Sequence, residues 1–173
     1  SKSGGHIGAN LGVIELTISL HKVFDVTQDI LIFDTGHQGY THKILTGRSA
    51  NFTSLNKFKG MSRFLSRSES KVDRIEASHA GTALSIAAGI EKGQQHTKNQ
   101  NRVIVVVGDG SLGEGMALEA LVFLGSIESN IIIVLNDNGM AIAPTVGSLG
   151  TMFMSEDWKI HSQHFFSAMG FHY

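Results

Sequence analysis

An acidic residue and an amide residue follow two apolar runs in the second half of the chain. The run 103–107 ends in the triplet GDG around Asp109, and the run 131–135 ends in the triplet NDN, whose last residue is Asn138. If both runs are parallel strands, their carboxyl ends lie at the edge where open α/β sheets bind ligands. A carboxylate and an amide oxygen there suit Mg²⁺, which fills its remaining positions with water and substrate phosphates. The spacing therefore predicts metal-bridged binding of a diphosphate.

Two other interpretations of the segment GDGSLG stay open on these residues alone. The segment matches the G-x-G-x-x-G fingerprint of dinucleotide sites and stands between a predicted strand and a predicted helix. Against that interpretation, the Asp109 carboxylate would repel a bare pyrophosphate unless a cation bridges the two. The glycines would also serve an ordinary strand–turn–helix connection that binds nothing. A Walker P-loop is excluded, because no Lys-Ser or Lys-Thr pair follows these glycines.

Three histidines stand in loops close to predicted strand or helix ends. His6 lies in the glycine-rich start, His37 follows the apolar run 30–33, and His79 precedes an alanine-rich stretch. A histidine in such a place can donate a hydrogen bond to a phosphate. We therefore treat these three as candidate ligand contacts. The other six are expected to be structural or surface residues: His21, His42, His96, His161, His164 and His172.

Composition restricts the classes of function. The chain has 173 residues, of which 42% are hydrophobic, enough for one domain with a buried core. A net charge of −1 gives no indication of nucleic-acid binding or of a basic membrane-binding patch. The absence of cysteine excludes disulfides and thiolate metal sites, and no apolar run is long enough to span a bilayer. We expect a cytoplasmic protein that acts on small molecules, with no nucleic-acid or membrane partner.

Apolar periodicity predicts alternating helices and strands. Helices are expected at 11–24, 78–91, 114–125 and 161–169, a short helix at 41–46, and strands at 30–33, 103–107 and 131–135. The charged segment 48–76 is expected to form short helical turns and exposed loop, and the segment after residue 138 to begin as loop. This alternation predicts an α/β fold whose parallel sheet is covered by helices on both faces.

The motifs, taken together, resemble a known family. GDG followed by the asparagine of NDN is similar to the signature of thiamine-diphosphate enzymes. The segments SGGHIGANLGVIELTISLHKVF, DTGHQGYTHKILTGR, SRSESKVDRIEASHAGTALS and NDNGMAIAPTVGSLG resemble, in this order, the N-terminal domain of 1-deoxy-D-xylulose-5-phosphate synthases. The string HKILTGR separates that branch from transketolases. The resemblance covers nearly the whole chain and implies a thiamine-diphosphate-binding fold.

The resemblance also implies a role for each site residue. Asp109 and Asn138 would bind Mg²⁺ through their side chains, and Met140 through its backbone carbonyl. His6 would face the reacting carbon of the thiazolium ring, and both His6 and His37 would be catalytic. The remaining contacts to thiamine diphosphate would come from His37, Ser78, His79, Ala80, Gly108, Gly110, Ser111 and Asn138.

The reaction implied is the condensation of pyruvate with glyceraldehyde 3-phosphate, with loss of CO₂, to give 1-deoxy-D-xylulose 5-phosphate. Residues 1–173 would form a single diphosphate- and Mg²⁺-binding domain, with the pyrimidine-binding and C-terminal domains absent from this chain. The chain would then work as a homodimer, or as a heteromer with a pyrimidine-binding domain. The alternatives are a subunit of a split transketolase-like enzyme with another acceptor, and a non-catalytic partner domain of the same fold.

Two segments depart from the family pattern. The turn 78–82 reads SHAGT, where the family usually has GHSST, and the segment between Gly150 and Phe165 is much shorter than the mobile loop expected there. The first departure puts in question the cofactor contacts around His79.

Overall fold

The computed structural model describes residues 4–76, 78–97, 101–137 and 147–173. Within these ranges three parallel strands form one sheet in the order β1 (Ile30–Phe33), β2 (Val103–Gly108) and β3 (Ile131–Asn136). All three strands agree with the sequence prediction to within one residue. The register pairs Gly108 with Asn136, so the GDG and NDN triplets begin side by side at one edge of the sheet.

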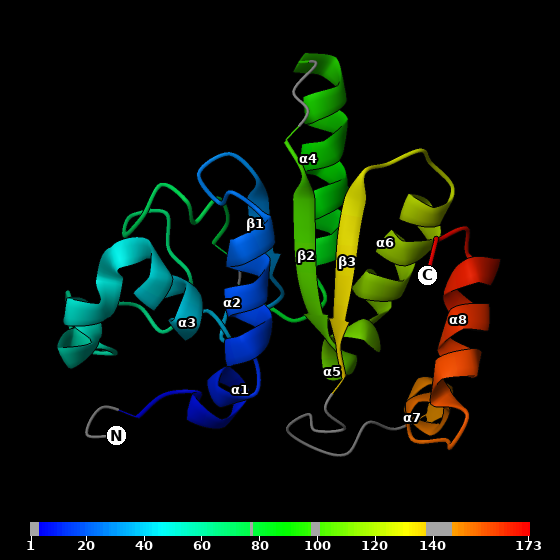
Figure 1. Ribbon diagram of the computed structural model, residues 1–173, viewed down its shortest axis with the longest axis horizontal. Coiled ribbons are helices and arrows are strands. Elements are labelled where there is room, and N and C mark those ends of the chain that lie inside the picture. Colours follow the sequence, from blue (N-terminus) through cyan, green and yellow to red (C-terminus); the bar gives the residue numbers. More distant parts are fainter. Residues whose placement is uncertain (1–3, 77, 98–100, 138–146) are drawn as a thin grey trace.

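The central strand β2 is covered on both faces, because its side chains alternate between two apolar clusters. Val103, Val105 and Val107 pack with α4 (Ala83–Thr97) and α6 (Gly115–Gly125). Ile104 and Val106 point the other way and pack against Leu20 of α2 (Ile14–Val23). A continuous run of β-branched residues is typical of a parallel strand buried on both faces. The predicted α/β class is thus confirmed, and Figure 1 shows α2 in front of the sheet and α4 and α6 behind it.

The helix predicted over 11–24 is instead two helices, α1 (Ile7–Leu11) and α2. They are separated at Gly12 and Val13, where Val13 has non-helical dihedral angles (φ −124°, ψ 14°) and is fully buried. Glycine weakens a helix at this place. The break lets α1 turn toward the carboxyl edge of the sheet, where α5 (Asp109–Leu112) also lies (Figure 1).

The short helix predicted at 41–46 begins as α3 (Tyr40–Lys43) and continues into a wide turn, η1 (Ile44–Arg48). Inside η1 the regular helical conformation breaks at Thr46 and Gly47, close to the predicted end, where Gly47 has a left-handed φ of +88°. A 3₁₀ turn, η2 (Ser49–Ser54), follows directly.

The C-terminal part contains α7 (Gly147–Phe153) and α8 (Trp158–Ala168). The helix α8 confirms the one predicted over 161–169, whereas α7 lies in a segment whose beginning was expected to be loop. In Figure 1 α8 lies beside α6, and α7 lies at the lower end of α8. No helix in the described ranges is long and apolar enough to cross a membrane.

Candidate functional site

The carboxyl edge of the sheet holds the predicted metal-binding carboxylate. Asp109 directly follows β2, opens the short helix α5, and is only 4% exposed. Gly108 before it is in extended conformation and opposite Asn136 in the register. The side-chain Nδ2 of Asn136 is buried and has no hydrogen-bond partner among the described residues. A buried amide donor without a partner costs about 1–3 kcal/mol, so this edge suits a polar ligand.

Two of the candidate histidines lie together, although they are distant in the sequence. The rings of His6 and His37 meet edge to face with centroids 5.4 Å apart. The Nδ1 atoms of both rings are buried and have no hydrogen-bond partner within the described part of the chain. Burial lowers the pKa of His37, and the proximity of His6 lowers it further, while the nearby Asp34 carboxylate opposes the shift. The lowered pKa favours the neutral ring of His37, which has one nitrogen that accepts a hydrogen bond and one N–H that donates.

The glycine-rich start packs tightly against Tyr40 at the beginning of α3. Gly5 has a φ of +136°, and a Cβ atom on it would lie 2.8 Å from the Tyr40 hydroxyl oxygen. The backbone N–H of His6 also approaches that hydroxyl at 3.4 Å. Only glycine fits at position 5, and this close approach brings His6 to the His37 loop.

The turn 78–82 is fixed at both sides. The backbone N–H of Gly81 donates to the carboxylate of Asp34, directly after β1, at a distance of 2.9 Å. Gly81 has a φ of +80°, and a Cβ atom there would lie 2.6 Å from the Cβ of Glu114, just before α6. The turn therefore lies between the end of β1 and the segment that follows α5. The ring of His79 is exposed, and its Nδ1–H donates to the Ala80 carbonyl at 2.8 Å.

A buried ionic cluster anchors the segment that follows His37. The Arg48 guanidinium donates to both carboxylate oxygens of Asp73, at 2.6 and 2.9 Å. Lys43 donates to Glu69 at 2.6 Å and to the Ser62 carbonyl at 2.7 Å. Burial alone raises the pKa of Asp73, but hydrogen bonds from His42, Arg48 and the Ser66 N–H outweigh it and hold that pKa well below its usual range.

A pair of histidines extends this cluster toward α2. His42 Nε2 lies 3.2 Å from Asp73, and because a carboxylate only accepts, this nitrogen carries the hydrogen. His42 Nδ1 lies 2.9 Å from Nε2 of His21. Burial, and then the neighbouring His42, lower the pKa of His21 to about 4. Both histidines are thus structural, as the sequence analysis expected.

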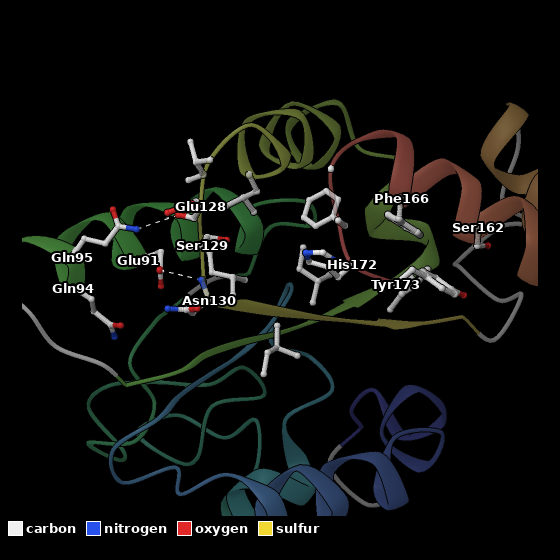
Figure 2. Close-up of a pocket in the computed structure, with 18 of the residues that line it drawn as sticks. Glu91, Gln94, Gln95, Glu128, Ser129, Asn130, Ser162, Phe166, His172 and Tyr173 are labelled. Atoms are coloured by element: carbon white, nitrogen blue, oxygen red, sulfur yellow. Dashed lines mark hydrogen bonds between the residues drawn. The ribbon is translucent and has the colours of Figure 1, made fainter.

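A wide groove lies elsewhere. It has a volume of about 1030 Å³ and runs between β3, α6, α8 and the C-terminal residues. Figure 2 shows its lining, including Phe166 and Tyr173, and the contact in which Glu91 accepts the backbone N–H of Asn130 at 3.2 Å. Of the predicted site residues that the structure describes, none lines this groove. It is therefore not the predicted cofactor site.

Comparison with known proteins decides the family. A family model described as 1-deoxy-D-xylulose-5-phosphate synthase matches residues 1–173. The chain belongs to this family. The synthase of Clostridium acetobutylicum is 53% identical over 149 residues, and that of Geobacillus sp. (strain WCH70) is 54% identical over 149 residues; each alignment covers 86% of this chain and 24% of the relative. The synthase of Mycobacterium sp. (strain KMS) is 55% identical over 146 residues, or 84% of this chain and 23% of the relative. The chain thus spans about a quarter of the length of these curated relatives.

The structure brings the predicted residues into three groups at the carboxyl edge. The first group follows β2 and contains Gly108, Asp109, Gly110 and Ser111. The second is the pair His6 and His37, and the third is the turn with Ser78, His79 and Ala80, which Asp34 joins to β1. The predicted ligands Asn138 and Met140 lie outside the described residues. Within the described ranges, no group of three His, Cys, Asp or Glu side chains could hold a metal.

Sequence reasoning missed the residues that hold these groups in place. The segment 48–76 was expected to be exposed turns and loop, and this is wrong for Asp73, which is 2% exposed, and for Arg48 before it, at 5%. Each charge is buried because the other neutralises it, a pairing that no local pattern reveals. Asp34 and Asn10 were likewise not recognised, since most of their partners are distant in sequence. For Asp34 the signal was a polar residue directly after an apolar strand, whereas Asn10 lies inside a helix and gave no such signal.

Proposed function

We propose that this chain forms the diphosphate- and Mg²⁺-binding part of a thiamine-diphosphate-dependent transferase. The reaction is the condensation of pyruvate with glyceraldehyde 3-phosphate to 1-deoxy-D-xylulose 5-phosphate and CO₂. The observation that carries the proposal is the pairing of Gly108 with Asn136, which starts both metal-binding triplets at one edge of the sheet. Membership of the synthase family supports the choice of substrates and cofactor.

The residues at this edge fit the cofactor's diphosphate and its metal. Asp109 supplies one buried carboxylate, and Asn138 and Met140 are the proposed further ligands. In proteins, Mg²⁺ is usually bound by one or two carboxylates together with phosphate oxygens. The unpartnered buried nitrogens of Asn136, His6 and His37 are available to polar groups of a ligand.

The chemistry divides between the cofactor and the chain. When bound, thiamine diphosphate stabilises the carbanion that decarboxylation produces. Burial, and then the neighbouring His6, lower the pKa of His37 and so favour its neutral ring, which offers one ring nitrogen as a hydrogen-bond acceptor and the other as an N–H donor. The ring of His6 lies edge to face with the ring of His37, so His6 can share this role.

The cofactor site needs a second protein surface in this proposal, supplied by a pyrimidine-binding domain of the same protein, of a second copy or of a partner chain. Large apolar side chains are exposed on both sides of the described structure. Leu11 is 60% exposed beside the proposed site, and Val122 on α6 is 65% exposed. Exposed apolar surface of this kind marks association surfaces when it is contiguous.

Calorimetric titration of thiamine diphosphate into the intact protein, with MgCl₂ or with EDTA, tests the proposal. Wild-type protein should bind the cofactor only with Mg²⁺, and Asp109→Ala should lose this binding while it keeps its fold. Asp157→Ala, which removes an exposed carboxylate just before α8, is the matched control and should bind normally. Unchanged cofactor affinity in Asp109→Ala would exclude the assignment.

A further inference from the structure

Asn10 is a buried amide in α1 that contacts both histidine loops. It is 5% exposed, although it is polar and belongs to a helix of only five residues. Its Nδ2 donates to the His6 carbonyl at 2.8 Å and to the His37 carbonyl at 2.7 Å. Its Oδ1 accepts the backbone N–H of Tyr40 at 2.8 Å. One side chain therefore makes three hydrogen bonds to three backbone positions around the site.

These bonds join two loops in which several residues have positive φ. His6 follows two glycines with positive φ, and His37 follows Thr35 and Gly36, which also have positive φ. Such loops lose much conformational entropy when they order. Both Nδ2 bonds are short, and an amide that bridges two carbonyls sets the distance between them directly.

We propose that Asn10 is a positioning residue that sets the edge-to-face arrangement of His6 and His37. The amide holds the two backbones, and the backbones hold the rings with their centroids 5.4 Å apart. The effect of this positioning on catalysis rests on the function proposed above, whereas the arrangement of the two rings does not depend on that function. Among the described residues, the Tyr40 hydroxyl accepts the His6 N–H at 3.4 Å and makes no bond to the His37 carbonyl, so it does not replace the amide.

Two substitutions separate the hydrogen bonds of Asn10 from its volume. Asn10→Leu introduces an apolar side chain of similar size and removes all three bonds. Asn10→Asp keeps an acceptor for the Tyr40 N–H and removes only the two donors. Leu20→Ala in α2 is the destabilised control, because it opens a cavity in the core without touching either histidine loop.

The readout is nuclear magnetic resonance of histidine-labelled intact protein, assigned with His6→Gln and His37→Gln. We expect the through-space contact between the two rings to disappear in both Asn10 variants and to remain in Leu20→Ala. In Asn10→Leu the pKa of His37 should rise toward the ordinary histidine value, because the neighbouring ring and the burial that lower it are lost. Turnover by the assembled enzyme should fall about a hundredfold, as for other small misplacements of reacting groups.

The results test two claims separately: that Asn10 positions the two histidines, and that the histidines take part in the proposed function. If Asn10→Leu only melts earlier, with the ring contact and the His37 titration unchanged, the positioning role is refuted. If the ring contact is lost but cofactor affinity and turnover are unchanged, Asn10 positions the histidines as inferred. In that case the role of the histidines in the proposed function is wrong.

Discussion

Asp34, the residue that follows β1, accepts a hydrogen bond from the backbone N–H of Ala83, the first residue of α4, at 2.9 Å. Its other carboxylate oxygen accepts the N–H of Gly81 at the same distance. Helices begin with N–H groups that have no partner inside the helix, and a local side chain usually caps them. Here the cap comes from a distant strand, so the start of α4 and the turn before it are attached to the sheet edge.

The first prediction compares two glycines near and within α4. Gly81→Ala should lower the free energy of unfolding by about 1–3 kcal/mol, because an L-residue is strained at a φ of +80° and its Cβ would meet Glu114. Gly89→Ala is the matched control, since a Cβ atom at this helical position would meet no atom within 4 Å. It should instead stabilise the protein by about 0.5–1 kcal/mol. Urea unfolding measures the free energy of unfolding of both variants, and equal changes in Gly81→Ala and Gly89→Ala would contradict the argument.

The second prediction concerns the buried pair of Arg48 and Asp73. Asp73→Asn should cost about 3–5 kcal/mol at pH 7, because it leaves the Arg48 charge buried without its counter-charge. The folded-state pKa of Asp73 is lowered, so its contribution is complete above its unfolded pKa of about 3.9 and is lost as the pH falls further. The stability gap between wild type and variant should therefore narrow below pH 4. A gap that is constant from pH 7 to pH 3 would contradict this assignment.

The third prediction concerns His21, whose pKa is lowered to about 4 in the folded chain. Between that value and the unfolded pKa of about 6.5, the unfolded chain binds more protons, so stability must fall as the pH falls. His21→Gln removes this proton uptake and should flatten the pH dependence of stability between pH 6.5 and 4. His164→Gln, at an exposed position of α8, serves as control and should keep the wild-type slope. Parallel curves for wild type and His21→Gln would show that another group causes the slope.

The sequence was sufficient for the sheet and for the first group of site residues. The strands are short runs of apolar residues rich in Val and Ile, and such runs are recognisable without their surroundings. Because parallel strands end at the same edge, the proximity of GDG and NDN follows from topology alone. The helix α4 was placed too early, over 78–91 instead of Ala83–Thr97, because its start depends on Asp34.

The supporting contacts could not be predicted in the same way. The bond from Asn10 to the His37 carbonyl, and the bonds between Arg48 and Asp73, join residues far apart in sequence. Local patterns carry no information on such partners, and a charged residue is by default expected at the surface. Burial of these polar groups is stable only because each has its partner.

The fourth prediction separates function from stability at the two site histidines. His6→Asn and His37→Asn should each lower turnover by about a hundredfold or more, as expected for loss of a proton-transferring or hydrogen-bonding group. Neither ring is fully buried, and their Nδ1 atoms have no partner within the described residues, so the free energy of unfolding should change little. His42→Asn is the opposite control, because its ring is fully buried and bonded to Asp73. If His37→Asn unfolds early but keeps normal turnover per folded molecule, His37 is structural.

The last prediction concerns the chain by itself. We expect the isolated 173-residue chain to associate in solution and to show no synthase activity with pyruvate and glyceraldehyde 3-phosphate. Ile132 in β3 is 38% exposed, and β3 lies at the end of the strand order formed by the described residues. An unpaired strand edge with apolar side chains promotes association. Ile132→Lys should therefore reduce association measured by sedimentation velocity, whereas Phe58→Ser, in a loop outside this surface, should not. Synthase activity of the purified chain without any partner would contradict the need for a second domain, since it would mean that residues within this chain activate the cofactor unaided.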